Sequence, residues 1–495
     1  MGNRWGRLPA IMLVVVVNAG RCPAAEAPGV RAECPCPAAS PSSAAGGAGG
    51  AAAYDGMVPD SRWVGLSAAS CSTSSCHGGP RGGLADVQSF AATVWSDRDP
   101  HARAYEALFQ PRSVRMARLL GIPAAHESHR CLVCHSVQDA SPEPLPELVL
   151  ADGVACAACH GDATGWKDLH TLATWKNLTP AEREALGYRN LTTPGARAAT
   201  CVRCHVGDDD HEVDHDLIAA GHPRLLFEFA AYQRLEPRHW SPLEKAETDP
   251  DFTARSWTVG QLVTLEAVAR LVELRATRAA ADLAAGRPSH WPELAEFDCY
   301  ACHRALGPTV GRAPADFTRP PAPGSPSWQP WYAAAAELVA AGLASEPAID
   351  ARRVGKTATD LRRLLATDWA ATDPARLERV VFEARGLASA ARSAAAEADR
   401  LPRVVLDDRR VRIESEAAAD PLLWRSWDAS TQAYLALEAA RAGGPAMLGP
   451  SAPPPPGSTR DRLDRLRESL LFPPGGDGPR GFDGQRFSVE RAKIR

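Results

Sequence analysis

The sequence predicts a mainly α-helical chain with extensive loops, in which a half rich in cysteine and histidine precedes a helical bundle. Three observations lead to this prediction. Apolar residues recur at helical spacing in several long segments. Short cysteine–histidine motifs are separated by turns that contain glycine and proline. Beyond residue 303 the chain contains neither cysteine nor histidine, so its two halves must differ in chemistry.

The first half contains four Cys-x-x-Cys-His motifs and one looser motif with four residues between its cysteines. Cys-x-x-Cys-His is the attachment sequence of c-type haem. Its two thiols bond to the porphyrin, and the following histidine supplies an axial nitrogen to the iron. The regular motifs are Cys131, Cys134 and His135; Cys156, Cys159 and His160; Cys201, Cys204 and His205; and Cys299, Cys302 and His303. The looser motif is Cys71, Cys76 and His77.

The alternative interpretation of these motifs is zinc binding, because zinc knuckles also use Cys-x-x-Cys pairs. A knuckle does not require histidine directly after its second cysteine, yet histidine follows every pair here and is only 14 of 495 residues. A thioredoxin-like motif would occur once, near a βαβ pattern that is not visible. We therefore expect about five covalent haem c groups. In the looser motif, Cys71 could instead be a spectator, with attachment through Cys76 alone.

The N-terminus has the pattern of a secretory signal over residues 1–27. Basic residues precede the apolar run 8–17, and small residues flank Glu26 as at a cleavage site. The run is too short to span a bilayer. Acylation at Cys22 is the alternative, but Arg21 directly before it argues against that. Because haem c is attached outside the cytoplasm, we expect a periplasmic protein with no transmembrane segment in the mature chain.

Composition divides the rest of the chain into five parts. We expect a disordered Ala/Pro/Gly-rich linker at 28–58, a haem-bearing domain at 59–307, a Pro-rich linker at 308–327, an α-helical C-terminal domain at 328–448 and an extended tail at 449–495. A long amphipathic helix is expected over 253–285. The C-terminal domain is expected to be a structural cover or a docking module, and not to be needed for haem attachment.

The net charge of −4 gives no reason to expect a nucleic-acid partner.

Nine histidines lie outside the motifs, and all of them lie at or before residue 290. This one-sided distribution predicts that many are second axial ligands, so that most haems are bis-histidine sites suited to electron transfer. Pro100 favours a helix start next to the first candidate, and a Gly-His-Pro turn holds the last one. The acidic run 208–216 is a solvated loop or a weak cation site. The candidate ligands are His101, His129, His170, His215 and His222.

Three stretches resemble the cytochrome c-554-type multihaem cytochromes. They are G-V-A-C-A-A-C-H-G at 153–161, A-G-H-P-R-L-L-F-E at 220–228 and F-D-C-Y-A-C-H at 297–303. The resemblance, over residues 61–306, implies a periplasmic, helical and loop-rich domain with closely packed haems. Two departures are the fifth motif and the wider spacing of the first. By motif position the resemblance implies that His101, His170 and His222 are distal ligands.

The leading interpretation is a pentahaem carrier that exchanges electrons with other redox proteins of the periplasm, and it assigns no catalytic residue. The alternative is a multihaem oxidoreductase in which one open haem acts on a small nitrogen or sulfur compound. Ammonia-forming nitrite reductases also have five haems, but their active haem uses Cys-x-x-Cys-Lys, which this chain lacks.

Overall fold

The computed structural model describes residues 65–82, 84–138, 145–240, 251–299, 303, 326–344, 346–347, 349–367, 370–401, 426–441, 456–471 and 482–492. The expected signal at 1–27, the linker at 28–58, most of the linker at 308–327 and Cys302 lie outside these residues.

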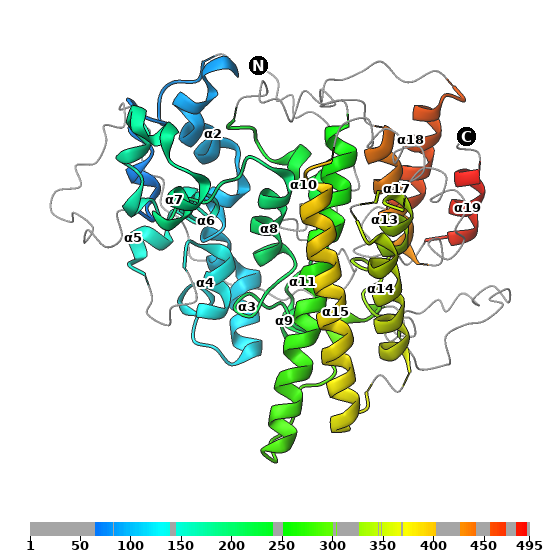
Figure 1. Cartoon of the computed structure of the whole chain (residues 1–495). Helices are drawn as coiled ribbons and strands as arrows, with labels where there is room; N and C mark the ends of the chain where they lie inside the picture. Colours follow the sequence, from blue (N-terminus) through cyan, green and yellow to red (C-terminus); the bar gives the residue numbers. More distant parts are fainter. Residues whose placement is uncertain are drawn as a thin grey trace, which may run out of the picture.

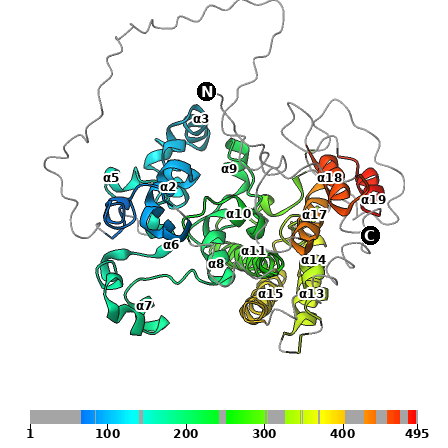
Figure 2. The same cartoon turned by 90° about the horizontal axis from the view of Figure 1, so that it is seen from above.

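The described residues form helices joined by loops and turns, which confirms the mainly α prediction. The β-pairing among them is one isolated bridge between Phe297 and Trp328. Short helices of the motif-bearing region lie on one side of the molecule, two long helices stand in the middle and the C-terminal helices lie on the other side (Figure 1). The view from above shows the same order (Figure 2). Within the described parts, no helix has the length and apolar character needed to cross a membrane.

The motif-bearing region consists of short helices whose ends are marked in the sequence. Thr179 and Glu182 form a capping box at the start of α7, with Pro180 at its first position. Gly121, in the left-handed region at φ 69°, ends α3. The helices are α2 (Ala91–Arg98), α3 (Pro111–Leu120), α4 (His129–His135), α5 (Glu147–Leu150), α6 (Cys156–His160), α7 (Pro180–Ala185), α8 (Pro194–His205), α9 (His215–Ala220) and α10 (Phe229–Leu235).

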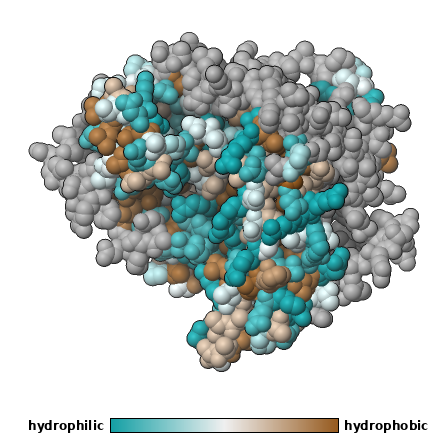
Figure 3. Space-filling view, viewed as in Figure 1, coloured by the Kyte–Doolittle hydropathy of each residue, from teal (hydrophilic) through white to brown (hydrophobic). Residues whose placement is uncertain are grey.

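The two central helices are α11 (Phe252–Ala284) and α15 (Pro374–Ala398), which pack along each other. The first matches the expected helix at 253–285. Side chains all around its N-terminal half are buried, because α8 and α10 cover one side and α13, α15 and α17 cover others. At the surface, ion pairs join the two helices: Arg385 and Arg392 of α15 bond to Glu273 and Glu266 of α11, respectively. Hydrophilic side chains dominate this face (Figure 3).

The C-terminal helices are α13 (Ala336–Gly342), α14 (Ala351–Ala366), α17 (Trp427–Arg441), α18 (Thr459–Leu470) and α19 (Gly484–Ala492). The last two correct the expectation of an extended tail at 449–495. Leu463, Leu466 and Leu470 recur at helical spacing and are buried, and the indole of Trp427 donates to the carbonyl of Leu470 at 2.8 Å. Burial of this apolar stripe therefore stabilises a helix here, although a proline-rich stretch precedes it.

The largest hydrophobic core does not divide at the expected domain boundary. It extends from Ala198 in α8 through Trp257 in α11 to Phe487 in α19. A smaller cluster, which includes Leu132 and Val149, lies under α4 and α5. Because α11 contributes to the same core as the C-terminal helices, the haem-bearing domain expected at 59–307 is not packed independently of residues 328–492.

A substitution at Gly260 tests the close approach of α10 to α11. A Cβ atom there would lie 2.5 Å from the Cβ of Phe229, so Gly260→Ala should lower the free energy of unfolding by about 1–3 kcal/mol. Gly386→Ala in α15 is the matched control, since its nearest neighbour would be 3.9 Å away, at Thr357. The control should be neutral or stabilising, by about 1 kcal/mol at most. Equal denaturation midpoints for the two variants would contradict the packing described here.

Candidate haem sites

Three regular motifs lie on helices, and this conformation explains their spacing. Residues 131–135 end α4, residues 156–160 form α6 and residues 201–205 end α8. Helical residues three and four apart lie on one face, so the two thiols and the imidazole of each motif point to the same side. The nine described motif cysteines have free thiols, as covalent attachment to a porphyrin requires.

The looser motif reaches a comparable arrangement through turns. The amide of His77 donates to the carbonyl of Cys71 at 3.3 Å, and the amide of Cys76 donates to Thr73 at 2.9 Å. These bonds fold the two additional residues into a closed loop. The ring of His77 is then fixed, because its Nδ1 donates to the carbonyl of Gln88 at 2.6 Å.

Four motif histidines face a second histidine from a distant part of the chain. The distances between ring centroids fall between 6.0 and 6.4 Å. The pairs are His77–His170 at 6.1 Å, His205–His101 at 6.0 Å, His160–His239 at 6.3 Å and His303–His215 at 6.4 Å.

The fifth motif histidine, His135, lies within electrostatic reach of His222. Burial, together with the charges of His135 and Arg112, lowers the pKa of His222 to about 4, against the opposing effect of its hydrogen bond to Pro223. The Arg112 guanidinium donates to the carbonyl of Gly221 at 2.6 Å, which fixes the Gly-His-Pro turn against α3. Four of the five motif histidines therefore face a second imidazole ring, and the fifth, His135, has His222 within electrostatic reach.

Most of the paired rings are oriented by a hydrogen bond from Nδ1, which leaves Nε2 free. Main-chain carbonyls accept these bonds in several pairs: Ala104 from His135 at 2.8 Å, Pro223 from His222 at 2.7 Å, Pro237 from His239 at 3.3 Å and Lys167 from His170. The Nδ1 of His101 instead lies 2.9 Å from a carboxylate oxygen of Asp99. Metal-binding histidines characteristically have such a partner on their other nitrogen.

Burial keeps several of these imidazoles neutral, which is the form that binds a metal. It lowers the pKa of His205 to about 3 and that of His160 to about 4, with neighbouring histidines adding to both effects. His101 differs. Burial alone would lower the pKa of His101, but the hydrogen bond and charge of Asp99 outweigh it and raise that pKa.

These sites fit haem iron. A metal–imidazole bond is about 2 Å long, so two imidazoles on opposite sides of one iron have ring centres roughly 6 Å apart. The four measured separations agree with this value. Trp166, whose ring packs edge-on against His170, has a buried Nε1 without a hydrogen-bond partner among the described residues. Such a donor suits a site shaped for an additional polar group.

Motifs that are far apart in sequence meet through their cysteines. The thiols of Cys71 and Cys156 lie close enough to shift each other's pKa, and so do those of Cys134 and Cys204. The first motif therefore adjoins the third, and the second adjoins the fourth. This arrangement brings the attachment positions of neighbouring sites together.

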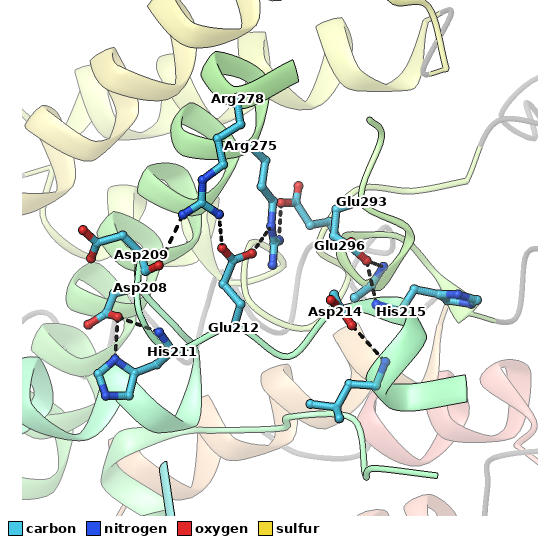
Figure 4. A network of polar contacts seen from close by, with 12 residues as sticks. Asp208, Asp209, His211, Glu212, Asp214, His215, Arg275, Arg278, Glu293 and Glu296 are labelled. Carbon is cyan, nitrogen blue, oxygen red and sulfur yellow. Dashed lines mark hydrogen bonds and ion pairs between the residues drawn. The ribbon is translucent and has the colours of Figure 1, made fainter. Parts of the chain in front are cut away.

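The loop that carries His215 is fixed by ion pairs to α11 (Figure 4). Arg275 bonds to Glu212 at 3.1 Å and to Glu296 at 2.5 Å, and the amide of His215 donates to Glu293 at 2.8 Å. In the same loop lie the carboxylates of Asp208, Asp209 and Asp210, close together. Asp208 is also bonded to Arg203 and to His211, whose Nδ1 lies 2.6 Å away. The acidic run thus interacts mainly with cationic side chains.

Of the five ligand candidates chosen from the sequence, His101, His170, His215 and His222 lie beside motif histidines. His129 begins α4, directly before the motif at 131–135. Sequence reasoning missed His239, which faces His160. The nearby Arg-His-Trp sequence has no helical or turn signature that marks His239 as a ligand.

Part of the chain is similar to one known protein family. Residues 70–161 and 155–217 match the family model of cytochrome c554 and c-prime. These residues include four of the five motifs, and the motif that begins at Cys299 lies beyond them. No curated protein matches the chain, and no solved structure does.

Proposed function

We propose that this chain, of which residues 70–161 and 155–217 match the family model of cytochrome c554 and c-prime, is a periplasmic pentahaem cytochrome c that carries electrons. Bound haem c supplies an iron that cycles between the ferric and ferrous states. The motif cysteines and histidines would hold the five groups, and the partner histidines would supply the second imidazole of each site.

The observation that carries this proposal is the pairing of four motif histidines with a second imidazole. The four pairs have ring centroids 6.0 to 6.4 Å apart, and we infer that His222 is the partner of His135, which lies within its electrostatic reach. A site with two imidazoles has no open coordination position for a substrate. Anchored Nδ1 atoms keep the rings in one orientation, so little rearrangement is needed when the charge of the site changes.

The fifth site, beyond the family match, is supported by the C-terminal region. The amide of Asp298 donates to Ser327 at 2.9 Å, and the amide of Gln329 donates to Glu296 at 2.7 Å. The Arg224 guanidinium lies 3.8 Å from the thiol of Cys299 and forms a two-point ion pair with Asp428 in α17. We infer that residues 328–492 help to form this site. We propose this in place of the expectation that these residues are not needed for haem attachment.

Intact-mass measurement tests the number of haems. Protein made in a host that matures cytochromes c should gain the mass of five haems, because five motifs place free thiols beside a histidine. In a Cys71→Ser/Cys76→Ser variant the gain should fall to four. A gain of four in the unmodified protein would remove the looser motif from the sites, and zinc without haem would overturn the proposal.

The electron paramagnetic resonance spectrum of the oxidised protein separates a carrier from an enzyme. Five paired sites should give low-spin signals only. A strong high-spin signal together with turnover of nitrite, hydroxylamine or nitric oxide would replace the carrier by an oxidoreductase with one open haem.

A further inference from the structure

One of the ten paired imidazoles has a different kind of hydrogen-bond partner. Asp99 lies at the junction of α2 and the following turn, and only 3% of its surface is exposed. Its Oδ1 accepts the amide of His101 at 3.0 Å and lies 2.9 Å from the ring Nδ1 of the same residue. Among the described residues, no other paired imidazole has a carboxylate on its Nδ1.

The chain conformation makes this contact specific. The side chain of Asp99 caps the turn that begins at Pro100, so its position is set by the backbone and not by a flexible stem. The amide and the ring of His101 are both directed to one carboxylate oxygen. Rotation of the imidazole would break one of the two bonds.

A carboxylate on Nδ1 has a stronger effect on the ring than a carbonyl has. It draws the Nδ1 proton toward itself and increases the electron density at Nε2, which raises the basicity of the imidazole as a ligand. A more basic ligand stabilises ferric iron relative to ferrous iron, because the higher positive charge gains more from donated electron density. The neutral carbonyls that accept from His77, His135 and His222 give less of this effect.

We propose that Asp99 is a positioning residue that fixes the His101 imidazole and lowers the reduction potential of the haem iron held between His101 and His205. This inference rests on the proposed function, since it requires that His101 is an axial ligand. The carboxylate of Asp99 distinguishes this haem site from the other four, because it lowers the reduction potential of this haem alone.

Asp99→Asn is the direct test, because asparagine keeps the acceptor oxygen and the shape but removes the charge. In a spectroelectrochemical titration of the full-length holoprotein, one haem of the five should shift to higher potential. We expect the equilibrium between its reduced and oxidised forms to change by about tenfold, which is 59 mV for one electron. Intact mass and low-spin signals should not change.

Two further variants distinguish the effect of the hydrogen bond between Asp99 and His101 from the effect of a nearby negative charge. Asp97→Asn removes an exposed carboxylate that is bonded to Arg81, and it should leave all five potentials unchanged. Glu236 lies within electrostatic reach of both His101 and Asp99, whereas the ring Nδ1 of His101 is bonded to Asp99, so Glu236→Gln should shift the potential of the same haem less than Asp99→Asn does. An unchanged titration for Asp99→Asn, or an equal shift for Glu236→Gln, would overturn the inference. A high-spin signal in the unmodified protein would instead contradict the proposed function.

Discussion

A His239→Ala variant is expected to keep all of its attached haem but to lose one of its low-spin signals. His239 faces His160 with 6.3 Å between ring centroids, and its Nδ1 is fixed by the carbonyl of Pro237. Removal of this imidazole leaves the iron at His160 with an open position. About one fifth of the haem should therefore become high-spin, and the reduced protein should bind about one equivalent of carbon monoxide.

The matched controls for this variant are the histidines outside the pairs. His290 is exposed, and His290→Ala should leave the spectrum unchanged. His129→Ala decides between the sequence-based candidate and the residue that the structure places at the site. A high-spin signal in His129→Ala and none in His239→Ala would show that the pairing at His160 is wrong.

A chain that ends at residue 307 is expected not to fold stably, because α11 would lose the helices that cover it. Leu377, Val380 and Leu387 of α15 are completely buried in the shared core. Truncation of a single buried leucine costs about 2–5 kcal/mol, and the whole stability of a domain is about 5–15 kcal/mol. Loss of α15 alone removes several such contacts, so thermal unfolding of the truncated protein should show no cooperative transition.

A nicked protein is the appropriate control for this truncation. A protease site inserted within residues 308–325 allows the backbone to be cut after folding, while both pieces remain present. The pieces should stay associated through size-exclusion chromatography and should retain a cooperative transition, because the core between α11 and α15 is intact. A truncated chain that unfolds cooperatively with five attached haems would contradict the shared core.

The haem motifs and the main helices could be predicted from the sequence because both depend on local geometry. Two thiols and one imidazole must reach a single porphyrin. In a helix, residues i, i+3 and i+4 lie on one face. The helix at 253–285 was predicted within one residue at each end from its apolar spacing. The helix around Leu463 does not follow from the sequence in the same way, because a run of prolines directly precedes its apolar stripe.

The sequence by itself determined which residues form the Cys-x-x-Cys-His motifs and that spare histidines lie in the same half of the chain. Tertiary structure alone decided which histidines face each other, since His77 and His170, or His101 and His205, are far apart in sequence and no spacing rule connects them. The same holds for Asp99 beside the His101 ring and for the core that α11 shares with α15. Periodicity reports the local backbone, whereas a pair of axial imidazoles and a common core depend on how distant segments pack.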